Sequence, residues 1–395
     1  MDTQNTPVHI HLWHRDFWFF SIAAMLIAMA EAAQVVDIVR MAKVCGLDNM
    51  TLGYAAAAFA AGMLIVGWFT SYLIQRFRRT RVCIMAAFLF LACLAVPQMA
   101  GWGSGANVGQ VLMAVRLASG ACAGLAVVVI VSTLIIDTCE PNQRTEANYA
   151  VGWFIRFALA LGPFVALMAM QWKGAKAIGW TAAAEVALAL VLLSATNLPF
   201  RTPSDNISLL SADRFIMPRS WMLASNLIVV VAAVGMVLAV QIQNPKFFTS
   251  MMVGFMLAVV AEKFVFVNAE LVSEAVAGMM LIIFALLIML TNTGLSSFLP
   301  PLLIGLGIGL VGSRFLLFFI KLSDHCQRGT SQSSYYVTWM VGLALGLLIG
   351  FSLVGTDGCL GCASDVMKIS LSMVVVAMAA YVAVTHRWYV KHKNR

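Results

Sequence analysis

Long apolar stretches separated by short polar segments run through the whole sequence. The stretches are far longer than the ten-residue alternations of membrane β-strands. A helix of about 20 apolar residues can cross the hydrocarbon core, where backbone polar groups must bond within a helix or a closed barrel. The pattern predicts twelve spanning helices, over residues 17–38, 50–72, 82–100, 107–136, 148–171, 177–196, 221–241, 246–266, 272–291, 297–321, 334–354 and 366–385.

Composition supports a protein built for lipid. Hydrophobic residues make up 62% of the chain and charged residues 11%, whereas soluble domains carry roughly 25% charged residues. The N-terminal MDTQNTPVHIHLWHRD lacks the basic start and the small-residue cleavage site of a signal peptide. We therefore expect the first span to remain in the mature protein.

The distribution of Lys and Arg predicts the orientation. With both termini cytoplasmic, sixteen of the 25 basic residues fall in inner segments and six in outer segments, as the positive-inside rule requires. A basic inner face that meets anionic lipid accounts for the net charge of +8 without a nucleic-acid partner. We expect a monomer in a bacterial cytoplasmic membrane.

Two distant segments resemble each other. IDTCEPNQRTEANYAVGW at 136–153 and SDHCQRGTSQSSYYVTW at 323–339 align Tyr149 with Tyr335, an offset of 186 residues. A second match, Gly67 to Gly254 with the basic segments that follow, has an offset of 187. Two nearly equal offsets predict an internal duplication. The predicted units are an N-terminal six-helix bundle over 1–199, a cytoplasmic linker over 200–220 and a C-terminal six-helix bundle over 221–395.

Motifs within the spans extend this pattern to a known family. Arg116, Gly120 and Gly124 share one face of span 4 at four-residue spacing, and small residues there allow close helix packing. Gly162 and Pro163 form a pair in span 5. With the duplication, these motifs resemble the major facilitator superfamily over nearly the whole chain. The resemblance implies an all-α fold of two pseudo-symmetric bundles and transport by alternating access, without a cofactor.

The loop after span 2 departs from the family pattern. Gln75 stands where the family usually has Asp, while Arg76 and Arg79 keep the basic positions. The mirror position in the second half, Glu262, keeps an acid. The resemblance implies a cytoplasmic gate, whereas the alternative is a set of solvated loop charges that contribute about 0–1 kcal/mol each. The expected gate residues are Gln75, Arg76, Arg79, Asp137, Arg144, Glu262, Asp324 and Arg328.

Charges inside spans indicate function because ionisable groups at the bilayer centre are costly. Glu31 in span 1 and Arg116 in span 4 fall at similar depths, and both spans line the central cavity in the resembled fold. We hypothesise that Glu31 binds the coupling proton and that Arg116 is its charge partner or regulator, since a change in their separation would change proton affinity. The alternative is a static buried ion pair.

A third charge, Arg156 in span 5, has no obvious acid partner nearby. It is expected either to bind an anionic group of a substrate or to reach Glu270 or Glu274 near span 9. Trp153 and Trp339 are either a symmetric pair near the cytoplasmic mouth or members of an interfacial aromatic belt. The complete expected cavity set is Gln34, Asp37, Trp153, Arg156 and Trp339.

Other chemistry finds little support in the sequence. P-loop, HExxH and GxSxG motifs are absent, which argues against an enzyme or an ATP-driven pump. His9, His11 and His14 lack a companion carboxylate or Cys, so no metal site is expected. Cys359 and Cys362, in the last outer loop, are able to close a small disulfide in an oxidising compartment.

The predicted function is secondary active transport of a small molecule, coupled to protons, with export (efflux) of amphipathic compounds by antiport favoured. Proton-coupled uptake of an organic anion is the alternative, and a receptor or lipid scramblase is a remote one. An apolar, aromatic cavity around Glu31 would favour export of lipophilic or cationic molecules. Two arginines exposed to the cavity without acid partners would favour an anion.

Overall fold

The computed structural model describes residues 11–100, 107–196, 208–266, 270–291, 298–354 and 360–394. Within these ranges, twelve helices are long and apolar enough to cross a membrane. The first six spans comprise α1 (Arg15–Cys45), α2 (Asn49–Gly67) with α3 (Thr70–Arg76), α4 (Arg79–Ala100), α5 (Val108–Val129) with η1 (Ile130–Leu134) and α6 (Ile135–Thr138), α7 (Arg144–Lys173) and α8 (Ala177–Ser194). The last six comprise η2 (Pro218–Ser220) with α9 (Trp221–Gln241), α10 (Pro245–Phe264), α11 (Leu271–Thr291), α12 (Leu299–Leu322), α13 (Arg328–Leu353) and α14 (Leu360–Ala380) with η5 (Tyr381–Thr385) and α15 (His386–His392).

Each predicted span corresponds to one observed span, with differences at the ends. The helix predicted over 334–354 begins earlier, at Arg328, because the polar residues 330–334 are buried between helices rather than left in a loop. The span predicted over 50–72 is interrupted after Gly67. There the carbonyl of Trp68 accepts a hydrogen bond from the Ser211 backbone, at 3.1 Å.

Burial follows a period of three spans. The most apolar windows of spans 1, 4, 7 and 10 are between 72% and 89% buried, whereas those of spans 3, 6, 9 and 12 are between 33% and 44% buried. A helix surrounded by other helices hides its whole circumference, and one that is half exposed faces lipid. Spans 1, 4, 7 and 10 therefore form the centre of the molecule, and α4, α8, α11 and α14, together with α10 at 39% buried, form its lipid-facing edge.

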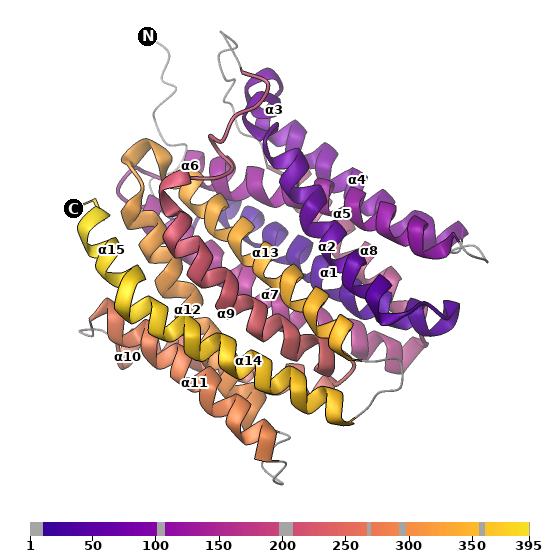
Figure 1. Cartoon of the computed structure of the whole chain (residues 1–395). Helices are drawn as coiled ribbons and strands as arrows, with labels where there is room; N and C mark the ends of the chain where they lie inside the picture. The colour runs from indigo at the N-terminus through magenta and orange to yellow at the C-terminus, as the bar shows by residue number, and fades with distance from the viewer. Residues whose placement is uncertain are drawn as a thin grey trace.

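Helices α1–α8 pack mainly on one another, and so do α9–α15 (Figure 1). The two groups, here called the first and second bundles, meet where α2 packs on α13 and where α7 packs on α10. The start of α1 and the end of α15 lie at one end of the molecule, here called the terminal face (Figure 1). The bundles touch at both ends, because Asn49 bonds to the Val354 carbonyl far from the terminal face and Arg328 donates to the Pro141 carbonyl, at 3.1 Å, close to it.

The described part of the linker, from residue 208, lies between the bundles at the terminal face. The ring of Phe215 is fully buried beside Trp68, with ring centroids 5.8 Å apart. Its carbonyl accepts a hydrogen bond from Ser333 of α13, at 3.0 Å. Arg214 donates to the Ser132 carbonyl in η1, at 3.2 Å. The linker thus joins the bundles through packing and hydrogen bonds as well as through the chain itself.

We expect Phe215→Ala to destabilise the protein by about 3 kcal/mol, since truncating a buried aromatic leaves a cavity. Thermal unfolding of the purified protein measures this change. Leu209→Ala, on the same segment but 55% exposed, is the matched control and should unfold like the wild type. Equal melting temperatures for the two variants would show that Phe215 does not hold the bundles together.

Candidate functional site

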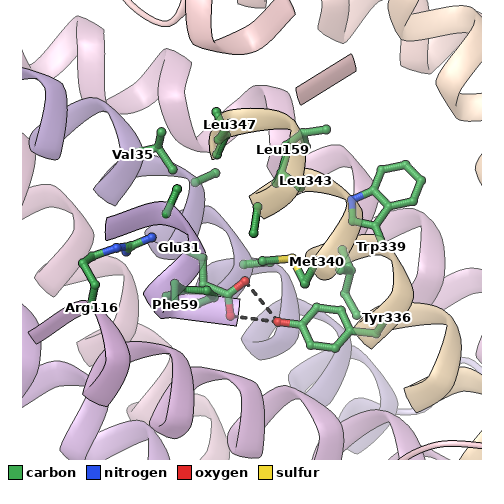
Figure 2. Close-up of a pocket in the computed structure, with 15 residues that line it drawn as sticks. Glu31, Val35, Phe59, Arg116, Leu159, Tyr336, Trp339, Met340, Leu343 and Leu347 are labelled. Atoms are coloured by element: carbon green, nitrogen blue, oxygen red, sulfur yellow. Dashed lines mark hydrogen bonds between the residues drawn. The ribbon is translucent and has the colours of Figure 1, made fainter. Parts of the chain in front are cut away.

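A cavity lies between the two bundles and contains about 560 Å³ of empty space, including its open mouth. Residues of α1, α2, α5, α7 and α13 line it. Most of these side chains are apolar or aromatic, among them Val35, Phe59, Leu159, Trp339, Met340 and Leu343 (Figure 2). Apolar and aromatic walls with a few polar groups are typical of small-molecule sites. The cavity thus has the character of a site for an amphipathic small molecule.

Glu31 of α1 is the acidic residue of this cavity. It is 4% exposed, and small neighbours such as Ala28 and Ala32 leave its side chain room along the cavity wall. Both carboxyl oxygens accept from the hydroxyl of Tyr336, at 2.9 and 3.1 Å (Figure 2). Because Tyr336 belongs to α13, this hydrogen bond crosses between the bundles. Relative movement of the bundles would change the environment of the carboxyl group.

Arg116 of α5 lines the same cavity but does not pair with Glu31. Its guanidinium donates to the Gln34 side chain and lies 4.5 Å from the centroid of the Phe59 ring. All these residues are described, and no direct ion pair joins Arg116 to Glu31. The static ion pair considered from the sequence is therefore not what this conformation contains. The guanidinium donates instead to Gln34, which lies one turn along α1 from Glu31.

Two of the predicted cavity residues lie elsewhere. Gln34 and Asp37 line a separate cavity inside the first bundle, with about 360 Å³ of empty space. Asp37 forms an ion pair with Arg40, at 2.6 Å, and accepts from Gln98 of α4, at 2.9 Å. These side chains point from α1 into its own bundle, so their assignment to the central cavity was wrong. Their spacing from Glu31 along the helix had suggested that they share the cavity-facing side of α1.

Arg156 and Trp153 also lie outside the central cavity. Arg156 is 1% exposed and donates to the Tyr335 hydroxyl, at 3.2 Å, while its guanidinium lies 4.6 Å from the centroid of the Trp153 ring. Its Nε and Nη2 have no hydrogen-bond partner in the described part of the chain. Trp339 does line the cavity and is 4% exposed, so it is not part of an interfacial belt.

Comparison with known proteins identifies the family. The sequence model of the Major Facilitator Superfamily matches residues 20–347. The chain belongs to this superfamily. The solved structures it resembles include the nucleoside transporter NupG, at 12% identity and a TM-score of 0.69, with 93% of this chain and 99% of that chain covered. Comparison with curated proteins gave no match.

Two further solved superfamily transporters share the fold. The POT family transporter PepTSo has 11% identity and a TM-score of 0.67, with 97% of this chain and 100% of that chain covered. The human organic anion transporter MFSD10 has 15% identity and a TM-score of 0.64, with 92% of this chain and 98% of that chain covered. Similarity at this level establishes a shared fold. Together with the family match, it makes the protein a multi-pass secondary transporter rather than an enzyme.

The expected gate of this superfamily member is only partly assembled as predicted. In the first bundle, Arg79 of α4 forms an ion pair with Asp137 of α6. In the second bundle, Asp324 lies 3.8 Å from Arg219 rather than beside Arg328. The remaining predicted residues of the first bundle, Gln75, Arg76 and Arg144, form no ion pair within the described chain, and Gln75 bonds back to Ser71, at 3.1 Å. Where the superfamily usually has Asp, the Gln75 side chain thus bonds within its own helix.

Glu262, the mirror position of Gln75, does connect the bundles. It accepts hydrogen bonds from Tyr149 of α7, in the first bundle, and from Ser313 of α12, in its own. Tyr149 is one of the repeated residues that revealed the duplication. Among the predicted gate residues, Glu262 and Arg328 therefore form hydrogen bonds between the bundles.

The small residues predicted for helix packing sit at close backbone contacts. A Cβ atom on Gly120 would lie 1.9 Å from the Phe59 carbonyl oxygen, and one on Gly162 would lie 2.4 Å from that of Met29. At Gly124 it would meet the Met63 side chain at 2.4 Å. Pro163 is buried inside α7. These glycines let α5 approach α2 and let α7 approach α1.

Sequence reasoning missed Tyr336 and the pair formed by Glu274 of α11 with Arg314 of α12. Two consecutive tyrosines in span 11, one of them in the repeat, were a usable signal for Tyr336. An acid and an arginine in consecutive spans were a signal for the second pair, which also removes Glu274 as a partner of Arg156. His9 and Cys359, and the side chain of Cys362, lie outside the described residues.

Proposed function

We propose that this transporter couples export of amphipathic, neutral or cationic compounds to protons, with Glu31 as the proton-binding group. The observation that carries the proposal is the Glu31 carboxyl in an apolar cavity, bonded by Tyr336 across the bundles. A carboxylate there needs a compensating donor, and separation of the bundles removes that donor. The proton affinity of Glu31 then depends on conformation, as coupling requires.

The cavity wall favours lipophilic or cationic cargo. Arg116 donates to Gln34 and to the Ala55 carbonyl and lies against the Phe59 ring, so two of its nitrogens are already hydrogen-bonded. Trp339, Tyr336 and Phe59 supply aromatic faces that bind apolar groups and cations. By the positive-inside distribution, we place the terminal face in the cytoplasm of a bacterial cell. Transport toward the far side is then export, by a monomer with protons as counter-ions.

One observation supports a second candidate, uptake of an organic anion. Arg156 is fully buried and keeps two donors without hydrogen-bond partners in the described chain. An anionic group reaching this guanidinium would satisfy them. Trp339 of the cavity wall and Arg156 both approach Gly312, so Arg156 lies close to the cavity wall.

Proteoliposomes with an imposed pH gradient test the proposal against this alternative. A panel of lipophilic cations and lipophilic carboxylates of matched size is offered to the reconstituted wild type. Gradient-dependent movement of cations in the direction opposite to protons supports export by antiport. Movement of carboxylates in the same direction as protons supports anion uptake. Flux that ignores the gradient for every compound would refute proton coupling.

Trp339→Ala should weaken binding of a lipophilic cation about tenfold, equivalent to about 1.4 kcal/mol, because the indole forms a large part of the cavity wall. Binding to the purified protein is measured by fluorescence titration or calorimetry. Trp172→Ala is the matched control, since Trp172 is 85% exposed at the end of α7. Unchanged affinity in Trp339→Ala would place the substrate outside this cavity.

A further inference from the structure

A second group of buried charges lies in the second bundle, away from the central cavity. Glu262 of α10 and Glu274 of α11, here called the acid pair, have carboxyl groups that lie against each other. Arg314 of α12 forms an ion pair with Glu274. Glu274 is fully buried, and apart from Arg314 neither of its oxygens accepts a well-formed hydrogen bond from the described residues. Two carboxyl groups thus share one guanidinium within this bundle.

The first bundle supplies further groups that interact with the acid pair. Tyr149 of α7 donates a hydrogen bond to Glu262. The charges of Glu262 and Arg156 both act on Tyr149, and both act on Tyr335. Tyr149 and Tyr335 therefore lie near both Glu262 and Arg156. In this conformation Arg314 pairs with Glu274, Tyr149 donates to Glu262, and the positive charge of Arg156 acts on the same tyrosine.

The other groups near the acid pair cannot take the place of Arg156. Tyr381 of η5 lies near Arg314 but carries no positive charge. Lys321, two turns along α12, and Lys263, next to Glu262, are exposed at the terminal face and solvated. His386 of α15 and Glu270 act on each other, farther along the same face. Tyr149 is thus the donor that the acid pair loses when the bundles separate, and Arg156, on the same helix, moves away with it.

We propose that the acid pair, Glu262 with Glu274, is a second proton-binding site, which takes up one proton when the bundles separate at the terminal face. Separation leaves two carboxylates with one guanidinium in a largely buried setting, and a proton shared by the pair removes the excess charge. Ion pairs broken on one side only are strongly destabilising unless the charge is neutralised. Lower pH on the terminal side therefore favours opening on that side, independently of Glu31.

The test measures opening directly in lipid nanodiscs. Spin labels are attached at Arg78→Cys in the first bundle and Lys391→Cys in the second, both exposed on the terminal face, in a background with the native cysteines replaced. Distance distributions are recorded across pH at constant ionic strength. The open-to-closed ratio is expected to rise as pH falls, by up to about tenfold per pH unit, the limit for one linked proton.

Three variants separate this site from Glu31. Because Glu31 would itself bind protons differently in the two states, the comparison is made in a Glu31→Gln background. The pH response should persist in Glu31→Gln and be lost when Glu274→Gln is added, in which Glu262 remains to pair with Arg314. Tyr149→Phe should shift the open-to-closed ratio toward the open state at every pH, because it removes the hydrogen bond to Glu262. This variant tests the proposal if Glu274→Gln does not fold. The proposal is overturned if Glu31→Gln alone loses the response, if adding Glu274→Gln leaves the response of Glu31→Gln unchanged, or if Tyr149→Phe leaves the ratio unchanged.

A sodium series at fixed pH identifies the cation, because a sodium ion would neutralise the pair equally well. Replacing choline with sodium should leave the distances unchanged. A response to sodium without a response to pH would overturn the assignment to a proton. These outcomes do not depend on whether Glu31 couples transport, so this site and the proposed function can fail separately.

Discussion

Glu31→Gln should abolish transport driven by a pH gradient while leaving substrate binding and downhill flux in place. Glutamine keeps the size of the side chain and can still bond to the Tyr336 hydroxyl, so the cavity and the contact between the bundles are preserved. It cannot exchange a proton. Each proton exchanged across one pH unit supports about a tenfold substrate gradient, and this accumulation should fall to the level seen without a gradient.

The first bundle offers a matched control for this variant. Glu185 of α8 is also a buried acid, 8% exposed, and its oxygens have no hydrogen-bond partner among the described residues. It does not line the central cavity. Glu185→Gln should therefore keep gradient-driven transport. Glu31 would not be the proton-binding group if Glu31→Gln kept gradient-driven transport, or if both variants lost this transport to the same extent.

Gly120→Val should prevent the protein from folding, the largest stability effect we expect. A Cβ atom at this position would lie 1.9 Å from the Phe59 carbonyl oxygen and 2.8 Å from its Cα. The obstacle is backbone, so no rotation of a side chain relieves it, and α5 would have to move away from α2. Overpacking commonly costs about 1–3 kcal/mol, and a displaced pair of helices costs more.

The measurement for Gly120→Val is the yield of monodisperse protein after extraction from the membrane, followed by its melting temperature. Ala114→Val, on the exposed side of the same helix, introduces the same β-branched side chain without the clash. It should behave like the wild type. A well-folded Gly120→Val protein with a wild-type melting temperature would mean that the close approach of α2 and α5 is not required.

The spans could be predicted because apolar length is a local property of the chain. The same holds for the duplication, which a constant offset reveals, and for Glu31 and Arg116, whose depths follow from their distance along their helices. The polar start of α13 was missed because hydropathy reads residues 330–334 as a loop, whereas the linker satisfies their hydroxyl groups in the fold.

Partners of the buried charges could not be predicted, because they depend on how helices rotate about their axes. Tyr336 is 305 residues from Glu31, and no local pattern links the two. Gln34 and Asp37 share a helix with Glu31 yet face a different cavity, since a small rotation decides which stripe of α1 meets α5 and α8. Arg314, placed within a span by the sequence, received no role: an acid in the preceding span was a signal, but the packing of α11 on α12 decides that the two side chains meet.

The central claim is that substrate and protons move in opposite directions through one cavity. Proteoliposomes are loaded with a permanently charged lipophilic cation and a trapped pH dye, with the membrane potential clamped and no initial pH gradient. A quaternary cation carries no proton of its own, so any pH change reports transport. The account predicts that the interior acidifies as the cation leaves through the wild type and does not change with Glu31→Gln. Cation efflux through the wild type with a constant or rising internal pH would contradict it.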